Sequence, residues 1–278
     1  MKNFINRSII VIISLAISFL VLVNIFTGSA SAASLKSLVF YGDTHSGYST
    51  HQKIVAGIEA QNPAKVFHAG DLVSYKYYLY DWLMFDSITA NLRAKVKYYP
   101  AIGNHDAYTG YFTQLFPYLP RGGRYYATTY SRLYIIVLDS NSSFKKDTYQ
   151  YKWFKSKLKK ARALGKTPIV MFHHPPVSSD GGEANPKYLL PLIKYYRVRF
   201  VFSGHYHHYE RSYYNRTYFI VTGGGGATLY DLENEPGPYS KKYVKTYHFC
   251  RLDLEKDKIK LTVFDRDLNV IDTARMWY

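Results

Sequence analysis

Short apolar runs rich in β-branched residues recur along the chain between amphipathic stretches, and five of them end in a cluster of Asp, Asn or His. The clusters are Asp43-Thr44-His45, Gly70-Asp71, Gly103-Asn104-His105-Asp106, His173-His174-Pro175 and Gly204-His205-Tyr206-His207. In a sheet of parallel strands joined by helices, the loops at the carboxyl ends of the strands converge on one crevice. The pattern therefore predicts an α/β protein in which polar residues distant in sequence meet at one edge of the sheet.

The same alternation locates the individual elements. Strands are predicted at 38–41, 65–69, 96–102, 125–130, 133–139, 168–172, 199–203, 217–222, 248–254, 258–264 and 270–273, and helices at 50–60, 81–92, 148–164 and 186–195. The first half reads βαβαβ and the tail reads all-β, which predicts mixed sheets without an obvious linker. Residues 204–207 are expected in an extended strand, because alternation along a strand would place His205 and His207 on the same side.

The first 32 residues read as a targeting segment. Two basic residues precede an uncharged run from Ile9 to Phe26, and Ala30-Ser31-Ala32 matches a cleavage signal. This predicts a secretory signal peptide at 1–32, followed by a single domain at 33–278. The alternative is a retained membrane anchor, because 18 apolar-leaning residues nearly span a bilayer. In both cases we expect the domain to be secreted or extracytoplasmic.

The charge of the chain favours an anionic partner. Lys and Arg number 36 against 20 Asp and Glu, which gives a formal net charge of +16. Charge alone leaves phosphate esters, nucleic acid and a lipid surface open. The Lys-rich helix at 148–164 is expected to be a solvated face, with polyanion docking as the minority interpretation. The single cysteine, Cys250, excludes an internal disulfide framework and a cysteine zinc cluster, and is expected to fill the core.

The clusters together offer a mixed oxygen and nitrogen ligand set. Two carboxylates, one amide oxygen and four imidazoles suit first-row transition metals better than Ca²⁺ or Mg²⁺. Seven ligands are too many for one tetrahedral ion but fit two ions that share a carboxylate. Asp71 is the natural shared ligand, because it is the only acid in its loop. Two divalent ions, two aspartates and a bridging hydroxide leave about one positive charge, which would attract a phosphoryl group.

In this order, Asp-x-His, Gly-Asp, Gly-Asn-His-Asp, a His before Pro, and Gly-His-x-His resemble the calcineurin-like metallophosphoesterase superfamily over roughly residues 38 to 226. The Gly-Asn-His-Asp and Gly-His-x-His blocks are the most specific. The glycines at 223–226 and the Phe-His-His-Pro-Pro block at 172–176 resemble the purple acid phosphatase-like branch. The resemblance implies a four-layer αββα sandwich with a dinuclear metal site at the sheet edge.

The resemblance also implies a role for individual residues. It implies that the first metal is held by Asp43, His45, Asp71 and His207, and the second by Asp71, Asn104, His173 and His205. His173 is preferred to His174 because the family ligand stands two positions before the proline. His105 matches the catalytic histidine, which contacts phosphate together with Asn104 and helps to protonate the leaving group.

Two positions depart from the patterns of the better-known branches. Purple acid phosphatases have Gly where His45 stands, and an iron-bound Tyr at the position of Ser74. Phosphoprotein phosphatases place there an Asp that orients the catalytic histidine. The sequence therefore does not assign the partner that orients His105. Asp106 is adjacent to His105 in sequence, but adjacency does not establish that the two side chains face each other. Asp180 and Glu183, in the loop after His174, are expected to shape the mouth of the site.

Together these features predict an exported two-metal phosphoesterase that hydrolyses phosphate monoesters, as acid phosphatases do, with Fe, Mn or Zn. The alternatives are a phosphodiesterase or nuclease on the same site, and a non-catalytic envelope binding protein. The expected partner is an anionic phosphate ester. Nucleic acid is not favoured, and membrane contact is expected only through an uncleaved N-terminal segment. The sequence leaves the oligomeric state open.

Overall fold

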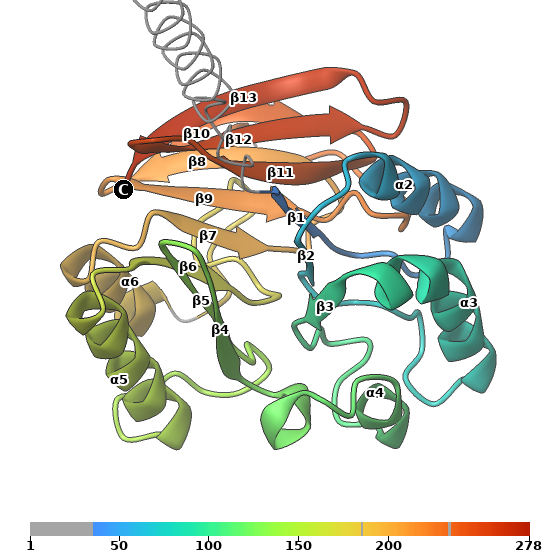
Figure 1. Cartoon of the computed structure of the whole chain (residues 1–278), viewed down its shortest axis with the longest axis horizontal. Helices are drawn as coiled ribbons and strands as arrows, with labels where there is room; N and C mark the ends of the chain where they lie inside the picture. Colours follow the sequence, from blue (N-terminus) through green and yellow to red (C-terminus); the bar gives the residue numbers. More distant parts are fainter. Residues whose placement is uncertain (1–35, 185, 233–234) are drawn as a thin grey trace, which may run out of the picture. The chain divides into compact units, whose positions relative to one another are not determined.

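Two mixed β-sheets stack face to face and carry helices on their outer faces (Figure 1). The computed structural model describes residues 36–184, 186–232 and 235–278, and Lys36–Tyr278 form one compact unit. The predicted targeting segment at 1–32 lies outside the described residues. Within the described part of the chain, no helix combines the length and the apolar character needed to cross a membrane.

The first sheet has six strands in the order β13-β12-β11-β1-β2-β3. Its strands are β1 (Leu38–Tyr41), β2 (Lys65–His68), β3 (Lys97–Pro100), β11 (His248–Leu254), β12 (Lys258–Asp265) and β13 (Val270–Trp277). β1, β2 and β3 are parallel, and β11 joins β1 in antiparallel fashion. Helices α2 (Tyr48–Ala60) and α3 (Leu79–Lys95) lie on its outer side, and the short α4 (Gly110–Leu115) follows (Figure 1).

The second sheet has seven strands in the order β10-β8-β9-β7-β6-β5-β4. Its strands are β4 (Tyr126–Tyr130), β5 (Leu133–Val137), β6 (Thr167–Met171), β7 (Phe200–Ser203), β8 (Tyr209–Tyr214), β9 (Thr217–Thr222) and β10 (Ser240–Val244). β5, β6, β7 and β9 are parallel neighbours. Helices α5 (Tyr149–Ala163) and α6 (Pro186–Tyr195) cover its outer face, and a 3₁₀ turn (Pro120–Gly123) precedes β4 (Figure 1).

The alternation of side chains along the central strands builds two separate apolar layers. In β7, Phe200 and Phe202 join the core between the sheets, whereas Val201 joins the layer beneath α5 and α6. The Phe202 ring stacks on Phe40 of the other sheet with centroids 3.9 Å apart. Removing such a ring costs about 3–5 kcal/mol of stability. Central strands such as β6 and β7 are buried on both faces, and their sequences are therefore continuous apolar runs.

The predicted α/β class and the four-layer αββα arrangement are confirmed. In α5, Phe154 and Leu158 are buried while the lysines at 152, 155, 159 and 160 are exposed, so this helix has the solvated face expected of it. Strands β8 and β10 and helix α4 were not expected from the sequence. The prediction of an extended strand at 204–207 is wrong, because these residues form consecutive tight turns that end where β8 begins. His205 there adopts a left-handed φ of 72°.

Candidate metal centre

The loops that follow β1 and β2 present Asp43 and Asp71 in the same unusual conformation. Both residues have a φ of 57°, a left-handed value that Asp tolerates better than most residues. The two loops are tied together, because Asp43 N–H donates to Gly70 O and Thr44 N–H donates to Asp71 O, each at 3.0 Å. The paired turns therefore direct both carboxylates into the space beyond the sheet edge.

Backbone amides from other loops hold one oxygen of each carboxylate. Oδ1 of Asp43 accepts from His205 N–H at 2.9 Å, and Oδ1 of Asp71 accepts from His105 N–H at 2.9 Å. Oδ2 of Asp43 is buried and has no hydrogen-bond partner among the described residues. Oδ2 of Asp71 lies 3.3 Å from His173 Nε2. One oxygen of each aspartate is thus positioned, and the other is available to a ligand.

On one side of Asp71, two imidazoles face the carboxylates. His207 Nδ1 donates to Thr228 O at 2.8 Å, and because a carbonyl only accepts, Nε2 keeps its lone pair and lies 3.7 Å from Asp43 Oδ1. His45 Nε2 is buried without a hydrogen-bond partner among the described residues. A histidine that ligates a metal commonly donates its other N–H to a carbonyl, as His207 does here.

On the other side, a second group forms around His173. Its Nδ1 donates to Ala69 O at 3.0 Å, which leaves Nε2 as the ligand atom. That Nε2 lies 2.9 Å from Asn104 Oδ1 and 3.3 Å from His205 Nδ1. The amide oxygen and the two imidazoles therefore converge next to Asp71. The structure thus brings together all seven residues that the sequence singled out as metal ligands.

Three sets of side chains offer ligand atoms within 4.8 Å of one another. They are His45, Asp71 and His105; Asp43, Asp71 and His173; and His173, His174 and His205. Asp71 occurs in two of these sets. It therefore sits where a carboxylate shared between two ions would be needed.

The electrostatics of the centre attract cations. Burial raises the pKa of Asp43 well above its ordinary value, and burial together with Asp71 raises the pKa of Asp106 to about 7. Burial alone would lower the pKa of His173, but the neighbouring aspartates outweigh it and raise this pKa to about 10. Buried carboxylates in such a space require paired positive charge, as a metal site supplies. The donor set and the unpartnered buried atoms fit a pair of metal ions.

Glycines allow the loops to approach the carboxylates closely. A Cβ on Gly103 would lie 2.1 Å from Asp71 Oδ1, and a Cβ on Gly204 would lie 2.2 Å from Asp43 Oδ2. Both distances are far below van der Waals contact, so a side chain at either position would displace the carboxylate. The glycine in each of these two blocks is therefore a steric requirement of the centre.

The structure supplies the orienting partner of His105 that the sequence left unassigned. His105 Nδ1 donates to the backbone carbonyl of Ser74 at 2.6 Å, and Nε2 faces Asp71 at 3.9 Å. Asp106 does not play this part. Its carboxylate accepts from the N–H groups of Leu72 and Gly103 at 3.0 Å each, and so braces the two neighbouring loops.

Glu183 and His174 make contacts at the centre that were not predicted from the sequence. Glu183 Oε2 lies 3.2 Å from His205 Nε2, and its other oxygen accepts from the Tyr206 hydroxyl at 3.0 Å. His174 N–H donates to Ser140 Oγ at 3.0 Å, while its Nδ1 lies 2.8 Å from the same oxygen. If the hydroxyl hydrogen points to Nδ1, His174 presents an Nε2–H donor to the site rather than a ligand atom.

Comparison with known proteins agrees with this geometry. The profile of the calcineurin-like phosphoesterases matches residues 36–209, well over half of the chain. Purple acid phosphatase 1 of Ipomoea batatas is 36% identical over 181 residues, which are 55% of this chain and 38% of that protein. The chain therefore spans less than half the length of this curated relative.

Solved structures share the fold at low sequence identity. A purple acid phosphatase from seeds of yellow lupin, Lupinus luteus, superposes with a TM-score of 0.76 at 21% identity, covering 88% of this chain and 54% of that one. GAP50, the anchor in the inner membrane complex of Plasmodium, superposes with a TM-score of 0.72 at 18% identity, covering 88% and 89%. Because the profile match covers more than half of the chain and the stacked sheets agree with it, this chain belongs to the calcineurin-like phosphoesterase family and is related to the purple acid phosphatases.

Proposed function

We propose that this protein is an exported phosphatase that hydrolyses phosphate monoesters at a dinuclear metal centre. The observation that carries the proposal is the position of Asp71, which belongs to two sets of converging ligand atoms. In this proposal Asp43, His45, Asp71 and His207 hold the first ion. Asp71, Asn104, His173 and His205 hold the second.

The chemistry of the donor set supports Fe, Mn or Zn, because it mixes imidazole nitrogen with carboxylate and amide oxygen. When bound, the two ions would supply Lewis acidity and a water of lowered pKa. The protein residues would orient the ester. Asn104 Oδ1 lies 2.9 Å from His173 Nε2, and an amide that binds a metal through its oxygen would keep its N–H groups as donors for a phosphate oxygen. His174, in the donor tautomer, would contribute a second contact.

His105 would act on the leaving group. With Nδ1–H held by the Ser74 carbonyl, the imidazole presents Nε2 toward the centre. A proton on Nε2 would pass to the departing oxygen as the ester bond breaks, and proton transfer of this kind contributes about 100- to 10,000-fold in rate. Its ring stacks on His45 with centroids 4.8 Å apart, which restricts its rotation.

The site is proposed to work outside the cytoplasm, with the segment 1–32 serving as a cleaved signal or as a retained anchor. The basic character of the chain supports an anionic substrate. Sequencing the N-terminus of the protein recovered from the culture medium and from the membrane fraction distinguishes the two forms.

The proposal is tested by metal analysis together with an activity panel. The wild type should bind two ions and hydrolyse monoesters faster than diesters, and Asp71→Asn should lose metal at both positions. Retention of two ions by Asp71→Asn would contradict the shared-ligand role. Faster cleavage of polynucleotides, weakening steeply with salt, would favour the nuclease. Less than one ion per chain with no hydrolysis would favour a binding protein.

A further inference from the structure

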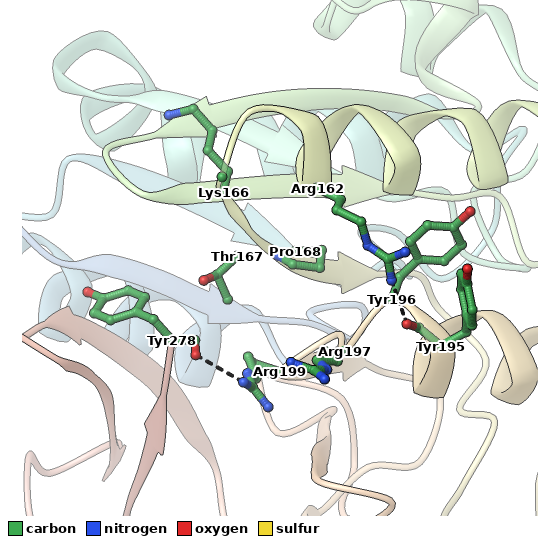
Figure 2. Close-up of a pocket in the computed structure, with 10 residues that line it drawn as sticks. Arg162, Lys166, Thr167, Pro168, Tyr195, Tyr196, Arg197, Arg199 and Tyr278 are labelled. Atoms are coloured by element: carbon green, nitrogen blue, oxygen red, sulfur yellow. Dashed lines mark hydrogen bonds between the residues drawn. The ribbon is translucent and has the colours of Figure 1, made fainter.

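A cavity of about 710 Å³, lined by the residues drawn in Figure 2, opens at one end of the second sheet. It lies at the amino ends of β6 and β7, where Thr167 and Arg199 line it, whereas His173 and His205 follow the carboxyl ends of the same strands. Six residues of extended chain separate Thr167 from His173, which corresponds to roughly 20 Å. The cavity is therefore a separate site.

Four of the residues that line this cavity carry a positive charge. They are Arg162 at the end of α5, Lys166 in the turn that follows, and Arg197 and Arg199 between α6 and β7. No acidic side chain is among the described residues that line the cavity. The cations come from two segments of the chain, residues 162–166 and residues 197–199, so they do not all belong to one helix.

Three of these cations donate to main-chain oxygens rather than to acidic side chains. Arg162 donates to Tyr195 O at 2.7 Å, Lys166 donates to Ser131 O, and Arg199 donates to Tyr278 O at 2.9 Å. Within the described part of the chain, none of the four forms an ion pair with an acidic side chain. Figure 2 shows the carbonyl contacts of Arg162 and Arg199.

Some of this charge has an ordinary structural explanation. Arg162 and Lys166 lie at the C-terminus of α5, where cations interact favourably with the helix dipole. Arg162 also packs over the rings of Tyr195 and Tyr196, at 4.7 and 4.6 Å from their centroids. The helix dipole also accounts for Arg197, which follows the end of α6 at Tyr195, but neither explanation applies to Arg199 at the start of β7.

Arg197 and Arg199 bring two positive charges close together at the cavity. Burial lowers the pKa of Arg199, and the charges of Arg197 and Arg216 lower it further. Arg197 is exposed, has a φ of 55°, and makes no side-chain hydrogen bond among the described residues. A strained arginine next to a partly buried one places two guanidinium groups beside an open cavity, and guanidinium matches phosphate oxygens in bidentate geometry.

We propose that this cavity binds an oligophosphate, that is, an anion with two or more linked phosphoryl groups. The four cations that line the cavity exceed the charge of one phosphate, no acidic side chain among the described residues lines it, and its volume falls in the range of small-molecule sites. The proposal is independent of the function of the metal centre. The ligand would be held by charge and guanidinium geometry, with no reaction at this site.

Calorimetric titration of the full chain with methylenediphosphonate, which phosphatases do not hydrolyse, tests the proposal. The double variant Arg197→Asn/Arg199→Gln should bind at least tenfold more weakly than the wild type. Asn tolerates the left-handed conformation, and Gln can keep a donor to Tyr278 O. Asp71→Asn should retain this binding, because its change is confined to the metal centre. Lys241→Ala/Lys242→Ala removes the same charge from exposed positions of β10 and should bind as the wild type does.

Three outcomes would overturn the proposal. These are wild-type affinity in the arginine variant, equal weakening in the lysine control, and loss of binding in Asp71→Asn. Equal affinity for inorganic phosphate and methylenediphosphonate would reject the oligophosphate class. If the double variant unfolds at a lower temperature, Arg197→Asn alone decides the question, because its side chain holds no other described element in place.

Discussion

A single backbone carbonyl orients the imidazole of His105. The Ser74 side chain is too short to orient an imidazole from this position, but its carbonyl accepts the Nδ1–H at 2.6 Å. The orientation therefore depends on the path of the chain after Asp71 rather than on the identity of residue 74. A carbonyl fixes the tautomer as a carboxylate would, without adding a negative charge to the centre.

The role of His105 is tested by His105→Asn. This variant should retain two metal ions, because His105 is assigned to the leaving group, and kcat should fall by about 100- to 10,000-fold. KM should change less, since the ligands of the phosphate remain. Metal analysis and steady-state kinetics on a monoester check both parts. Loss of metal from His105→Asn would place this residue among the ligands instead.

Tyr75 bears on the colour of the iron-loaded protein. Its side chain is 59% exposed and its ring packs against Tyr77. The purple band of the phosphatases that this chain resembles arises from a tyrosinate on ferric iron, and Ser74 stands at that position. We expect the iron-loaded protein to be pale in visible absorption spectra. A strong purple band that Tyr75→Phe abolishes would refute this assignment.

At the scale of elements, the loop between β6 and α6 reaches back over the metal centre. Glu183 contacts the imidazole of His205, and both Glu183 and the backbone of Asp180 accept from the Tyr206 hydroxyl. His205 therefore has one nitrogen toward His173 and the other held by this loop. The loop thus positions a proposed ligand of the second ion, which agrees with its expected place at the mouth of the site.

Glu183→Ala should weaken the binding of the second metal ion by about tenfold, the lower end of the range for residues that support a ligand. Competition titration with a chromogenic chelator measures the two affinities separately. Glu183→Gln should recover part of the loss, because an amide oxygen still accepts from His205 Nε2–H. Glu255→Ala, an exposed acid paired with Arg275, is the control. Equal affinities in Glu183→Ala and the wild type would assign the contact to packing alone.

For the molecule as a whole, buried neutral histidines link stability to pH. His51 lies between the first sheet and α3, near the Tyr41 hydroxyl and stacked on Phe85. Burial lowers its pKa to about 3 in the folded protein, whereas the unfolded chain binds the proton with a pKa of about 6.5. Its contribution to stability is therefore complete above pH 6.5 and is lost progressively as the pH falls toward 3.

The variant His51→Gln removes this titration while keeping a polar group near Tyr41. Between pH 7.5 and 5.0, the metal-free variant should lose about 2 kcal/mol less unfolding free energy than the metal-free wild type. Denaturant unfolding at several pH values checks the difference. Chelator in both samples removes the contribution of metal release. Parallel stability curves would show that His51 does not drive the acid sensitivity.

Residue types and their order determined much of this protein. The apolar runs were long enough, and rich enough in β-branched residues, to predict the strands of both sheets that lead into the candidate centre. Parallel strands place their following loops at one edge of their own sheet, so the meeting of Asp43 with Asp71 was predictable, as was that of His173 with His205. The two pairs belong to different sheets, and only the stacking of the sheets brings them together. The family resemblance then predicted the αββα layers and the assignment of each proposed ligand.

Only the tertiary structure decided the contacts that depend on the path of a loop. Turn conformations at 204–207 arise where the loop backbone bonds to Asp43, so strand alternation did not apply there. Every residue has a backbone carbonyl, so the residue type at position 74 could not predict the contact with His105. The contact of Glu183 with His205 joins residues that no local sequence pattern relates. The basic cavity is formed by the ends of α5 and α6 and by the start of β7. The packing of the helices brings these segments together. The charge of each segment can be read from the sequence, but the fact that they line the same cavity cannot.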